Sequence, residues 1–194
     1  MLKFGKKLNY RPLLMSLFWA LLCGSLFGFN ISKSLGIRIA IIIFGIIFIG
    51  HYLTILPTIF NYWDSSDKFI RYNDKSNPFK RLLIMLIPKL DTYKVIDKKL
   101  IRSIQITGLP MTNDLLSSAL FVATEGGFLY NLMVMIRYPV KVKLLLKNGQ
   151  IINLNLSRDY VDHPAETIGK LKIFLNDFPS EELDLSPETK HLIY

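Results

Sequence analysis

The sequence predicts an α+β membrane protein, in which an N-terminal transmembrane helical hairpin is followed by a β-rich domain with a C-terminal helix. The 194-residue chain is 51% hydrophobic and yet carries a formal net charge of +9, and its mean hydropathy is +0.31. Two apolar runs, 12–30 and 39–60, each match the length of about 20 helical residues that crosses a bilayer. After residue 62, apolar and polar residues alternate between turn signals, which indicates strands.

The two apolar runs are joined by the short segment ISKSLGIR, so residues 12–62 are expected to form a hairpin with both outer ends on one side of the membrane. Basic residues flank its outer ends, at Lys3, Lys6, Lys7 and Arg11 before it and at Lys68, Arg71, Lys75, Lys80 and Arg81 after it. The linker holds only Lys33 and Arg38. The positive-inside bias therefore predicts that both termini are cytoplasmic.

A cleaved signal peptide, or a lipoprotein acylation site at Cys23, is the alternative interpretation of the first run. Leu22 stands before Cys23 where a small residue is expected, no A-x-A-like site follows, and a second full-length apolar run comes soon afterwards. We therefore expect the first run to be a membrane helix. Cys23 is the one cysteine in the sequence, so it cannot form an internal disulfide.

Small residues recur at every fourth position of the first run, at Ser16, Ala20, Gly24 and Gly28. In lipid, apolar side chains gain nothing from leaving the solvent, so small residues favour helix association by letting two backbones approach. This small-residue stripe predicts a helix-packing surface. Its partner is either the second helix, through Gly45 or Gly50, or the same helix in another copy, which would make a homo-oligomer. The short linker favours the second helix.

His51 lies near the middle of the second run and is a candidate intramembrane polar site, because ionisable groups at that depth are costly and often functional. Two interpretations stay open. The imidazole is either hydrogen-bonded within the hairpin, to Ser16 or a backbone carbonyl, or it is a station on an ion pathway. Pro57 predicts a kink near the end of this helix, and Tyr62 with Trp63 are expected at the headgroup level.

Strands are expected through most of residues 63–178. KFIRYND (68–74) and the apolar run RLLIMLIP (81–88) each predict a strand, and residues 92–108 predict two strands around a turn at 97–99. Residues 115–136 have two interpretations, a third membrane segment or the two strands SALFVATE and FLYNLMVMIRY. A charge beside Gly126 and Gly127 favours the strands, because it suits a turn better than lipid.

Asn148–Gly149 is the clearest hairpin signal, and it predicts a two-residue type I′ turn. The apolar positions Val140, Val142, Leu144 and Leu146 alternate with Lys141, Lys143 and Lys147, so these lysines are a candidate surface contact. The helix predicted over 162–178 directs Ile168, Leu171, Ile173, Phe174 and Leu175 to the core. Residues 179–194 are expected to be a polar, loosely held tail.

A run of antiparallel strands closed by one amphipathic helix resembles the pleckstrin-homology-like (PH-like) superfold. The segment VKLLLKNGQIINLNLSRDYVDHPAETIGKLKIFL is similar to the final hairpin and helix of bacterial PH-like membrane proteins, many of which carry an N-terminal pair of transmembrane helices. NYRPLLMSLFWALL leading into the first helix resembles the EbsA-type proteins of low-GC Gram-positive bacteria. Over residues 10–178 this resemblance implies a PH-like domain at 63–178, localisation to the bacterial cell (inner) membrane, and a role in cell-envelope biogenesis or pore formation.

Composition and motifs argue against enzymes and nucleic-acid binders. His51, His163 and His191 fall in separate elements, no Cys/His cluster or phosphate-binding loop occurs, and we expect no enzymatic activity, cofactor or metal. Residues 1–60 hold six of the 24 basic residues and none of the 15 acidic residues, so the excess charge belongs to the membrane portion rather than to a nucleic-acid-binding face.

The function expected from the sequence is that of a non-enzymatic integral membrane protein whose cytosolic domain binds a protein partner or the membrane surface. The basic N-terminus, 1–11, supplies candidate lipid-headgroup contacts at Lys3, Lys6, Lys7 and Arg11. The alternative is an oligomeric pore or small transporter that is built from the hairpins, with His51 lining its path.

Overall fold

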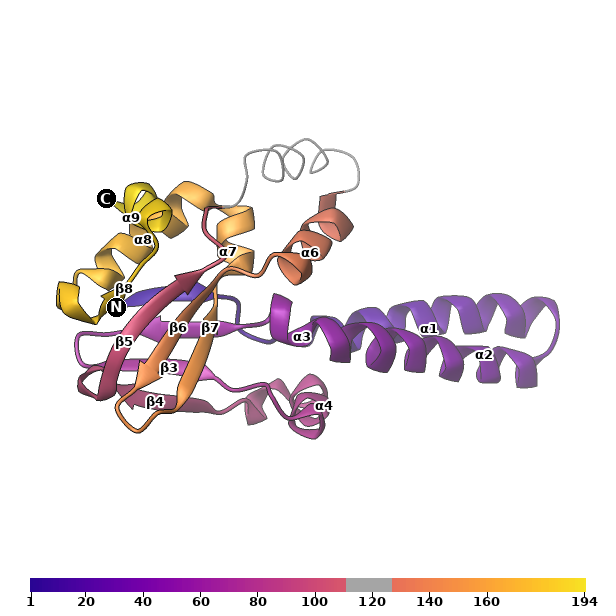
Figure 1. The fold of residues 1–194 in the computed structure, drawn as a ribbon. Coiled ribbons are helices and arrows are strands. Elements are labelled where there is room, and N and C mark those ends of the chain that lie inside the picture. Colours follow the sequence, from indigo (N-terminus) through magenta and orange to yellow (C-terminus); the bar gives the residue numbers. More distant parts are fainter. Residues whose placement is uncertain (111–126) are drawn as a thin grey trace. The chain divides into compact units, whose positions relative to one another are not determined.

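The computed structural model describes residues 1–110 and 127–194, and these fall into two compact units. The β unit contains Met1–Lys6, Asn61–Asn73 and Tyr93–Tyr194, and the helical unit contains Lys7–Phe60 and Asp74–Thr92. The α+β class with an N-terminal apolar helix pair is confirmed (Figure 1). The unit boundaries differ from the contiguous domains expected, because residues 1–6 join the β unit and residues 74–92 join the helices.

The helical unit begins with two long helices. Helix α1 covers Arg11–Asn30, and after Ile31 and Ser32 the second helix runs as α2 (Lys33–Gly45), the π-helical segment η1 (Ile46–Leu53) and α3 (Thr54–Ile59). The Ser32 hydroxyl caps α2 by accepting from the Leu35 backbone N–H at 3.3 Å. Both Arg11–Asn30 and Lys33–Ile59 are long and apolar enough to cross a membrane.

The predicted strand at 81–88 is wrong, because this segment forms helix α4 (Pro78–Leu86), followed by the 3₁₀ turn η2 (Pro88–Leu90). The Asn77 side chain accepts from the N–H groups of Phe79 and Lys80, and Pro78 occupies the first helical position. These two start signals set a helix before the apolar run begins. The run itself is too short for its periodicity to separate helix from strand.

One antiparallel sheet of the β unit has the order β1-β2-β3-β4, with β1 at Leu2–Gly5, β2 at Tyr62–Ser65, β3 at Phe69–Asn73 and β4 at Tyr93–Asp97. Strand β1 lies in the segment that was expected to be only a basic N-terminus. Its residues pair with β2 from Leu2↔Ser65 to Gly5↔Tyr62. The chain therefore leaves this sheet after Gly5, makes the helix pair, and returns to the neighbouring strand.

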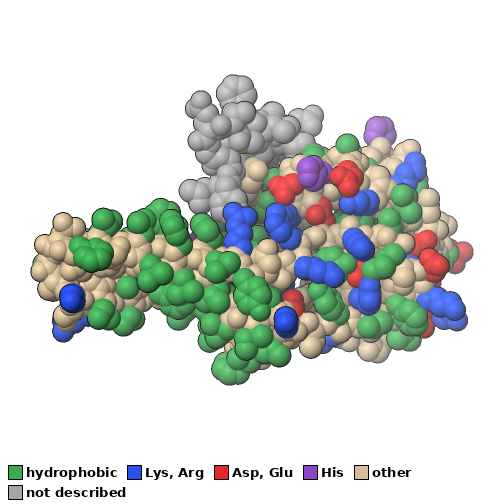
Figure 2. Space-filling view, turned by 180° about the vertical axis from the view of Figure 1, so that it is seen from behind, with side chains coloured by type: hydrophobic (Ala, Val, Ile, Leu, Met, Phe, Trp, Pro, Cys, Tyr) green, Lys and Arg blue, Asp and Glu red, His purple; other side chains and the backbone are tan. Residues whose placement is uncertain are grey.

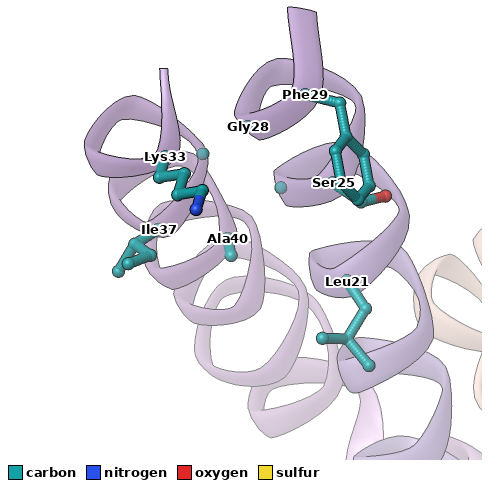
Figure 3. A pocket seen from close by; sticks show the side chains of 9 residues that line it. Leu21, Ser25, Gly28, Phe29, Lys33, Ile37 and Ala40 are labelled. Atoms are coloured by element: carbon teal, nitrogen blue, oxygen red, sulfur yellow. The ribbon is translucent and has the colours of Figure 1, made fainter.

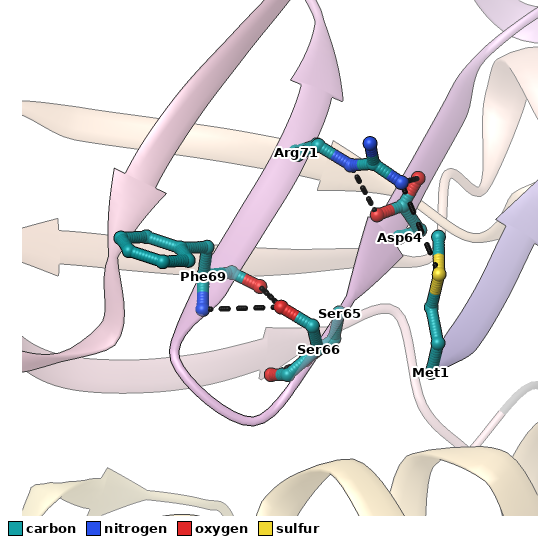
Figure 4. Close-up of polar contacts among 6 residues, drawn as sticks. All are labelled: Met1, Asp64, Ser65, Ser66, Phe69 and Arg71. Carbon is teal, nitrogen blue, oxygen red and sulfur yellow. Dashed lines mark hydrogen bonds and ion pairs between the residues drawn. The ribbon is translucent and has the colours of Figure 1, made fainter.

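Asp64 and Arg71 form an ion pair on this sheet (Figure 4). The Arg71 Nε donates to Asp64 Oδ1 at 2.8 Å and its Nη2 donates to Oδ2 at 3.1 Å, which is the two-pronged geometry that a guanidinium favours. Burial, together with the Asp64 carboxylate, raises the pKa of Tyr62 to about 12. At neutral pH this end of β2 therefore carries the Asp64–Arg71 ion pair and an uncharged Tyr62 side chain.

The second sheet has the order β7-β6-β5-β8, with β5 at Ile101–Thr107, β6 at Lys141–Leu146, β7 at Ile151–Asn155 and β8 at Leu183–Asp184. The β6–β7 hairpin and its buried alternation are confirmed. The predicted type I′ turn is wrong. Gly149 has φ +82°, no described non-glycine residue has positive φ, and Leu146 N–H bonds the Gln150 carbonyl, so the loop has three residues with glycine last.

Trp63 lies at the centre of the β unit's core, and the prediction that it anchors at the headgroup level is wrong. Its ring stacks on Phe4 at 4.1 Å and meets Phe174 edge-on at 5.4 Å. The indole N–H donates to the Asn155 carbonyl at 3.2 Å, so the polar edge of the ring is satisfied inside the protein. Both sheets and helix α8 (Pro164–Leu175) contribute to this core.

The predicted C-terminal helix is confirmed as α8, preceded by α7 (Ser157–Asp162). Leu171, Phe174 and Leu175 are buried as expected, whereas Ile173 is exposed. FLYNLMVMIRY was predicted as a strand and instead lies in helix α6 (Gly127–Arg137), because an apolar run of this length suits either element. SALFVATE falls among residues 111–126, outside the described residues, as does much of the alternative third membrane segment.

Residues 179–194 are not a loose tail. They form the 3₁₀ turn η4 (Ser180–Glu182), strand β8 and helix α9 (Pro187–Ile193), and α9 lies beside α8 (Figure 1). Leu185 and Ile193 are buried in the core, and the Thr189 hydroxyl donates to the Leu109 carbonyl at 3.1 Å. These contacts, together with the parallel pairing of β8 with β5, are spread along a segment of mainly polar composition, which is why the sequence did not indicate them.

We expect deletion of residues 179–194 to lower the free energy of unfolding by about 3 kcal/mol or more, since each buried Leu or Ile side chain contributes about 1.5–3 kcal/mol. Thermal unfolding of the full-length protein in detergent, followed by circular dichroism, measures the loss. Removal of the exposed Tyr194 alone is the matched control and should change little. Equal melting temperatures for the two truncations would contradict the packing described for α9.

Candidate functional site

The small-residue stripe lies at the contact between α1 and α2, which is the intramolecular partner that the short linker favours. Ser16, Ala20 and Gly24 are buried and Gly28 is half-buried. A Cβ added to Gly24 would lie 2.7 Å from the Ala40 Cβ, and one added to Gly36 would lie 2.5 Å from the Gly24 carbonyl oxygen. Nothing but hydrogen fits at these two positions, and the helix backbones touch there.

The partner residues were predicted incorrectly. Gly45 and Gly50 have no atom within 4 Å of an added Cβ, and the stripe packs instead on Gly36 and Ala40 near the start of α2. The reason is the length of the connection. Because α2 begins at Lys33, directly after Ser32, the residues that face Gly24 and Gly28 are those within its first two turns.

A groove of about 410 Å³ follows this contact near the connection between the helices (Figure 3). Leu21, Ser25 and Phe29 line it from α1, and Lys33, Ile37 and Ala40 line it from α2. Gly24, Gly28 and Gly36 also line it. Apart from Ser25 and Lys33 its lining is apolar, so it favours lipid or helix contacts.

His51 lies in the π-helical segment η1 and is half-buried. Its ring meets the Tyr52 ring edge-on at 5.1 Å. The predicted bond to Ser16 is not formed, because the Ser16 hydroxyl donates to the Pro12 carbonyl at 2.7 Å within its own helix. The π-helical segment η1 ends at Leu53, four residues before Pro57. In a regular α-helix the Pro57 ring would clash with the Leu53 carbonyl, so Pro57 is a local cause of the wider helical turn.

The outer surfaces of the helix pair are apolar and uncovered. Only 22% of the most apolar window of Arg11–Asn30 and 17% of that of Lys33–Ile59 are buried. Figure 2 shows hydrophobic side chains over this part of the surface. The exposed residues include Leu14, Leu17, Phe18, Leu21, Leu22 and Leu26 on α1 and Ile37, Ile41 and Ile42 on α2. A core helix of a water-soluble protein would instead bury most of its apolar side chains.

The predicted basic contacts are distributed between the units. Lys141 and Lys143 are half-exposed on β6, where Asn155 and Asn153 are their partners on β7, and Lys147 is exposed in the loop. Lys3 lies in β1 and Lys6 follows it in the β unit, whereas Lys7 and Arg11 belong to the helical unit. The four N-terminal bases are therefore not one continuous flexible tail. In the described parts of the chain, no three His, Cys, Asp or Glu side chains gather as a metal site requires.

Lys75 is buried in the helical unit, whereas the sequence indicated it only as one of the basic residues that flank the membrane helices. Its ammonium group donates to the Phe60 carbonyl and lies 3.8 Å from Asp91 Oδ2, and both side chains are buried. Burial lowers the pKa of Lys75 to about 8, an effect that Asp91 only partly opposes. No spacing rule connects residues 60, 75 and 91, so the local sequence held no signal for this cluster.

No protein family, curated protein or solved structure matches this chain. The function is therefore inferred from the geometry of the helix pair and of the β unit.

The contact between α1 and α2 predicts a graded response to alanine substitution. Gly36→Ala and Gly24→Ala should lower the stability of the full-length protein in detergent, because each added methyl group overlaps backbone or Ala40. Gly28→Ala should be tolerated, since its nearest neighbour is 3.7 Å away. Gly45→Ala is the control and should be neutral or stabilising by up to about 1 kcal/mol, the helix-propensity difference. A uniform effect at all four positions would contradict the observed contact.

Proposed function

We propose that this chain is a non-enzymatic integral membrane protein of the bacterial cell membrane, with the helix pair spanning the bilayer and the β unit in the cytoplasm as an interaction domain. The uncovered apolar surface of α1 and α2 carries the proposal. Soluble monomers rarely expose apolar patches of more than a few hundred Å². In a bilayer the same side chains face apolar lipid chains. A helix also satisfies its backbone hydrogen bonds internally, as the bilayer interior requires.

The placement of both termini on one side is supported by the composition of the β unit. Residues 1–6 and 93–194 belong to this unit, and Phe4 and Ile193 contribute to one core. Short segments connect the outer ends of the helix pair to the paired strands β1 and β2 of that unit. The excess of basic residues at these ends favours the cytoplasmic side.

The proposal of a PH-like interaction domain is supported by strand order. Two antiparallel meanders, β1–β4 and β5–β7, precede helix α8, whose apolar side packs into a core common to both sheets. The half-exposed Lys141 and Lys143, with the exposed Lys147, offer a basic face for a protein partner or an anionic membrane surface. A role in cell-envelope biogenesis follows from the resemblance to EbsA-type proteins.

Membrane topology tests the proposal. In a Cys23→Ser background, Ser34→Cys should react with a membrane-impermeant maleimide in intact spheroplasts, because it lies at the outer tip of the hairpin. Lys190→Cys should react only after lysis, because α9 belongs to the cytoplasmic unit. Both positions are exposed, so accessibility differs only by the membrane. Labelling of Lys190→Cys in intact spheroplasts would overturn the orientation, and removal of the protein from membranes by carbonate would overturn insertion.

The alternative of an oligomeric pore is tested by ion flux. The small-residue stripe is already occupied by α2, so it is not available to join hairpins into a ring. We therefore expect purified protein in liposomes to give no ion flux above that of empty liposomes. A flux that His51→Ala abolishes would replace our proposal with the pore.

A further inference from the structure

Helix α4 and the turn η2 also expose an apolar surface, in addition to the outer faces of the helix pair. Five large apolar side chains in this segment are each 40% to 68% exposed, namely Phe79, Leu83, Leu86, Ile87 and Leu90. Phe79, Leu83 and Leu86 follow each other at helical spacings of four and three, so they share one side of α4. Ile84 and Met85 are buried on the other side. Packing within the helical unit accounts for the apolar residues on the buried side of α4, but not for those on its exposed side.

The same segment is basic. Residues 76–90 contain Lys80, Arg81 and Lys89 and no acidic residue. Lys80 donates to the Asp74 carbonyl at 3.2 Å, and Arg81 donates to the carbonyls of Lys75 and Ser76, so both heads lie by the loop before the helix. Lys89 is exposed in η2. Positive charge therefore borders the exposed apolar face at both of its ends.

The buried Lys75 cluster positions this segment. Lys75 precedes α4, Asp91 follows η2, and the Lys75 ammonium group joins both to the carbonyl of Phe60. Phe60 is the residue directly after α3, at the end of the second membrane-length helix. Helix α4 also contacts α1 and η1 within the helical unit. The segment is thereby held beside the cytoplasmic ends of the proposed spans, which is the depth of the lipid headgroups.

We propose that α4 and η2 form an interfacial anchor that inserts its apolar face into the cytoplasmic leaflet and binds anionic phospholipid headgroups through Lys80, Arg81 and Lys89. The inference rests on the proposed membrane insertion of the helix pair. An apolar face bordered by basic residues is the pattern of helices that lie in the plane of the interface. Negative charge on the cytoplasmic leaflet attracts basic residues held at its surface.

Depth-dependent quenching tests the anchor in the full-length protein. Phe79→Cys and Leu83→Cys, each in a Cys23→Ser background, are labelled with an environment-sensitive fluorophore and reconstituted into phosphatidylcholine–phosphatidylglycerol vesicles. A lipid with a nitroxide just below the headgroup is the quencher. We expect roughly half of the emission to be lost at both positions, because an interfacial helix buries its apolar face about 5–10 Å deep.

Two further positions make each outcome decisive. Phe18→Cys on α1 reports on the span, and Ile151→Cys, which is similarly exposed but lies on β7, should not be quenched. Quenching at 18 without quenching at 79 and 83 overturns the anchor and leaves membrane insertion intact. No quenching at 18 overturns the proposed function itself. Blue-shifted emission at 79 without quenching means that a second copy or a protein partner covers this face, which also overturns the anchor.

The headgroup contact has its own test. Lys89→Glu should reduce quenching at position 83 in vesicles with phosphatidylglycerol and leave it unchanged in pure phosphatidylcholine. Lys147→Glu makes the same charge change at an exposed lysine of the β unit and should have no effect. Equal quenching for both variants in both lipids would overturn the binding of anionic headgroups.

Discussion

The pairing of β1 with β2 is the constraint on which the rest of the structure depends. Because the chain leaves this sheet at Gly5 and returns to it at Tyr62, the helix pair is an insertion between two neighbouring strands. Gly5 has φ +72°, and an added Cβ would overlap the Asn61 carbonyl, so only glycine allows this exit. Its N–H donates to Asp159 at 2.6 Å. Burial raises the pKa of Asp159, and the bond from Gly5 compensates part of the cost of that buried carboxylate.

The short connection between α1 and α2 has a consequence for their packing. Only Ile31 and Ser32 join the two helices, so the backbones lie close together near this connection. Packed helices are usually separated by about 8–10 Å, and small residues allow a closer approach. Gly24 and Gly36, which touch backbone to backbone, provide that approach in this sequence. A groove of about 410 Å³ runs beside this contact.

The proposed membrane contacts differ in physical character. Along α1 and α2 the apolar side chains point outward, and the backbone contact between the helices needs no charge. At α4 an apolar face and basic residues occur together, and the buried Lys75 holds the segment to the end of the second helix. Burial disfavours the charged form of the Lys75 ammonium group, so this group is a poor source of stability. Its contacts nevertheless specify one position for α4. Among the described residues, the core around Trp63 is formed by side chains of the β unit.

The sequence by itself determined the elements whose signals are local. The length of the apolar runs predicted α1 and α2, alternation and Asn148–Gly149 located the β6–β7 hairpin, and Pro164 with the apolar periodicity located α8. On α1 the spacing of small residues also identified the contact surface. Each of these signals lies within a window of about 20 residues or fewer, so no distant part of the chain was needed to interpret it.

Only the tertiary structure decided what depends on residues far apart in the chain. Strand β1 exists because Leu2–Gly5 finds β2, some sixty residues later, and Trp63 is buried because that pairing places β2 inside a sheet. The choice of Gly36 rather than Gly45 as partner follows from the two-residue connection, and the fixed position of α9 follows from contacts with Leu109 and the core. The short apolar segment at α4 was compatible with strand or helix, and the Asn77 cap with burial of Ile84 and Met85 favoured the helix. The physical reason is common to all of these features. A local pattern indicates which conformations a segment tolerates, and the free energy that selects one of them comes from the surfaces against which the segment packs.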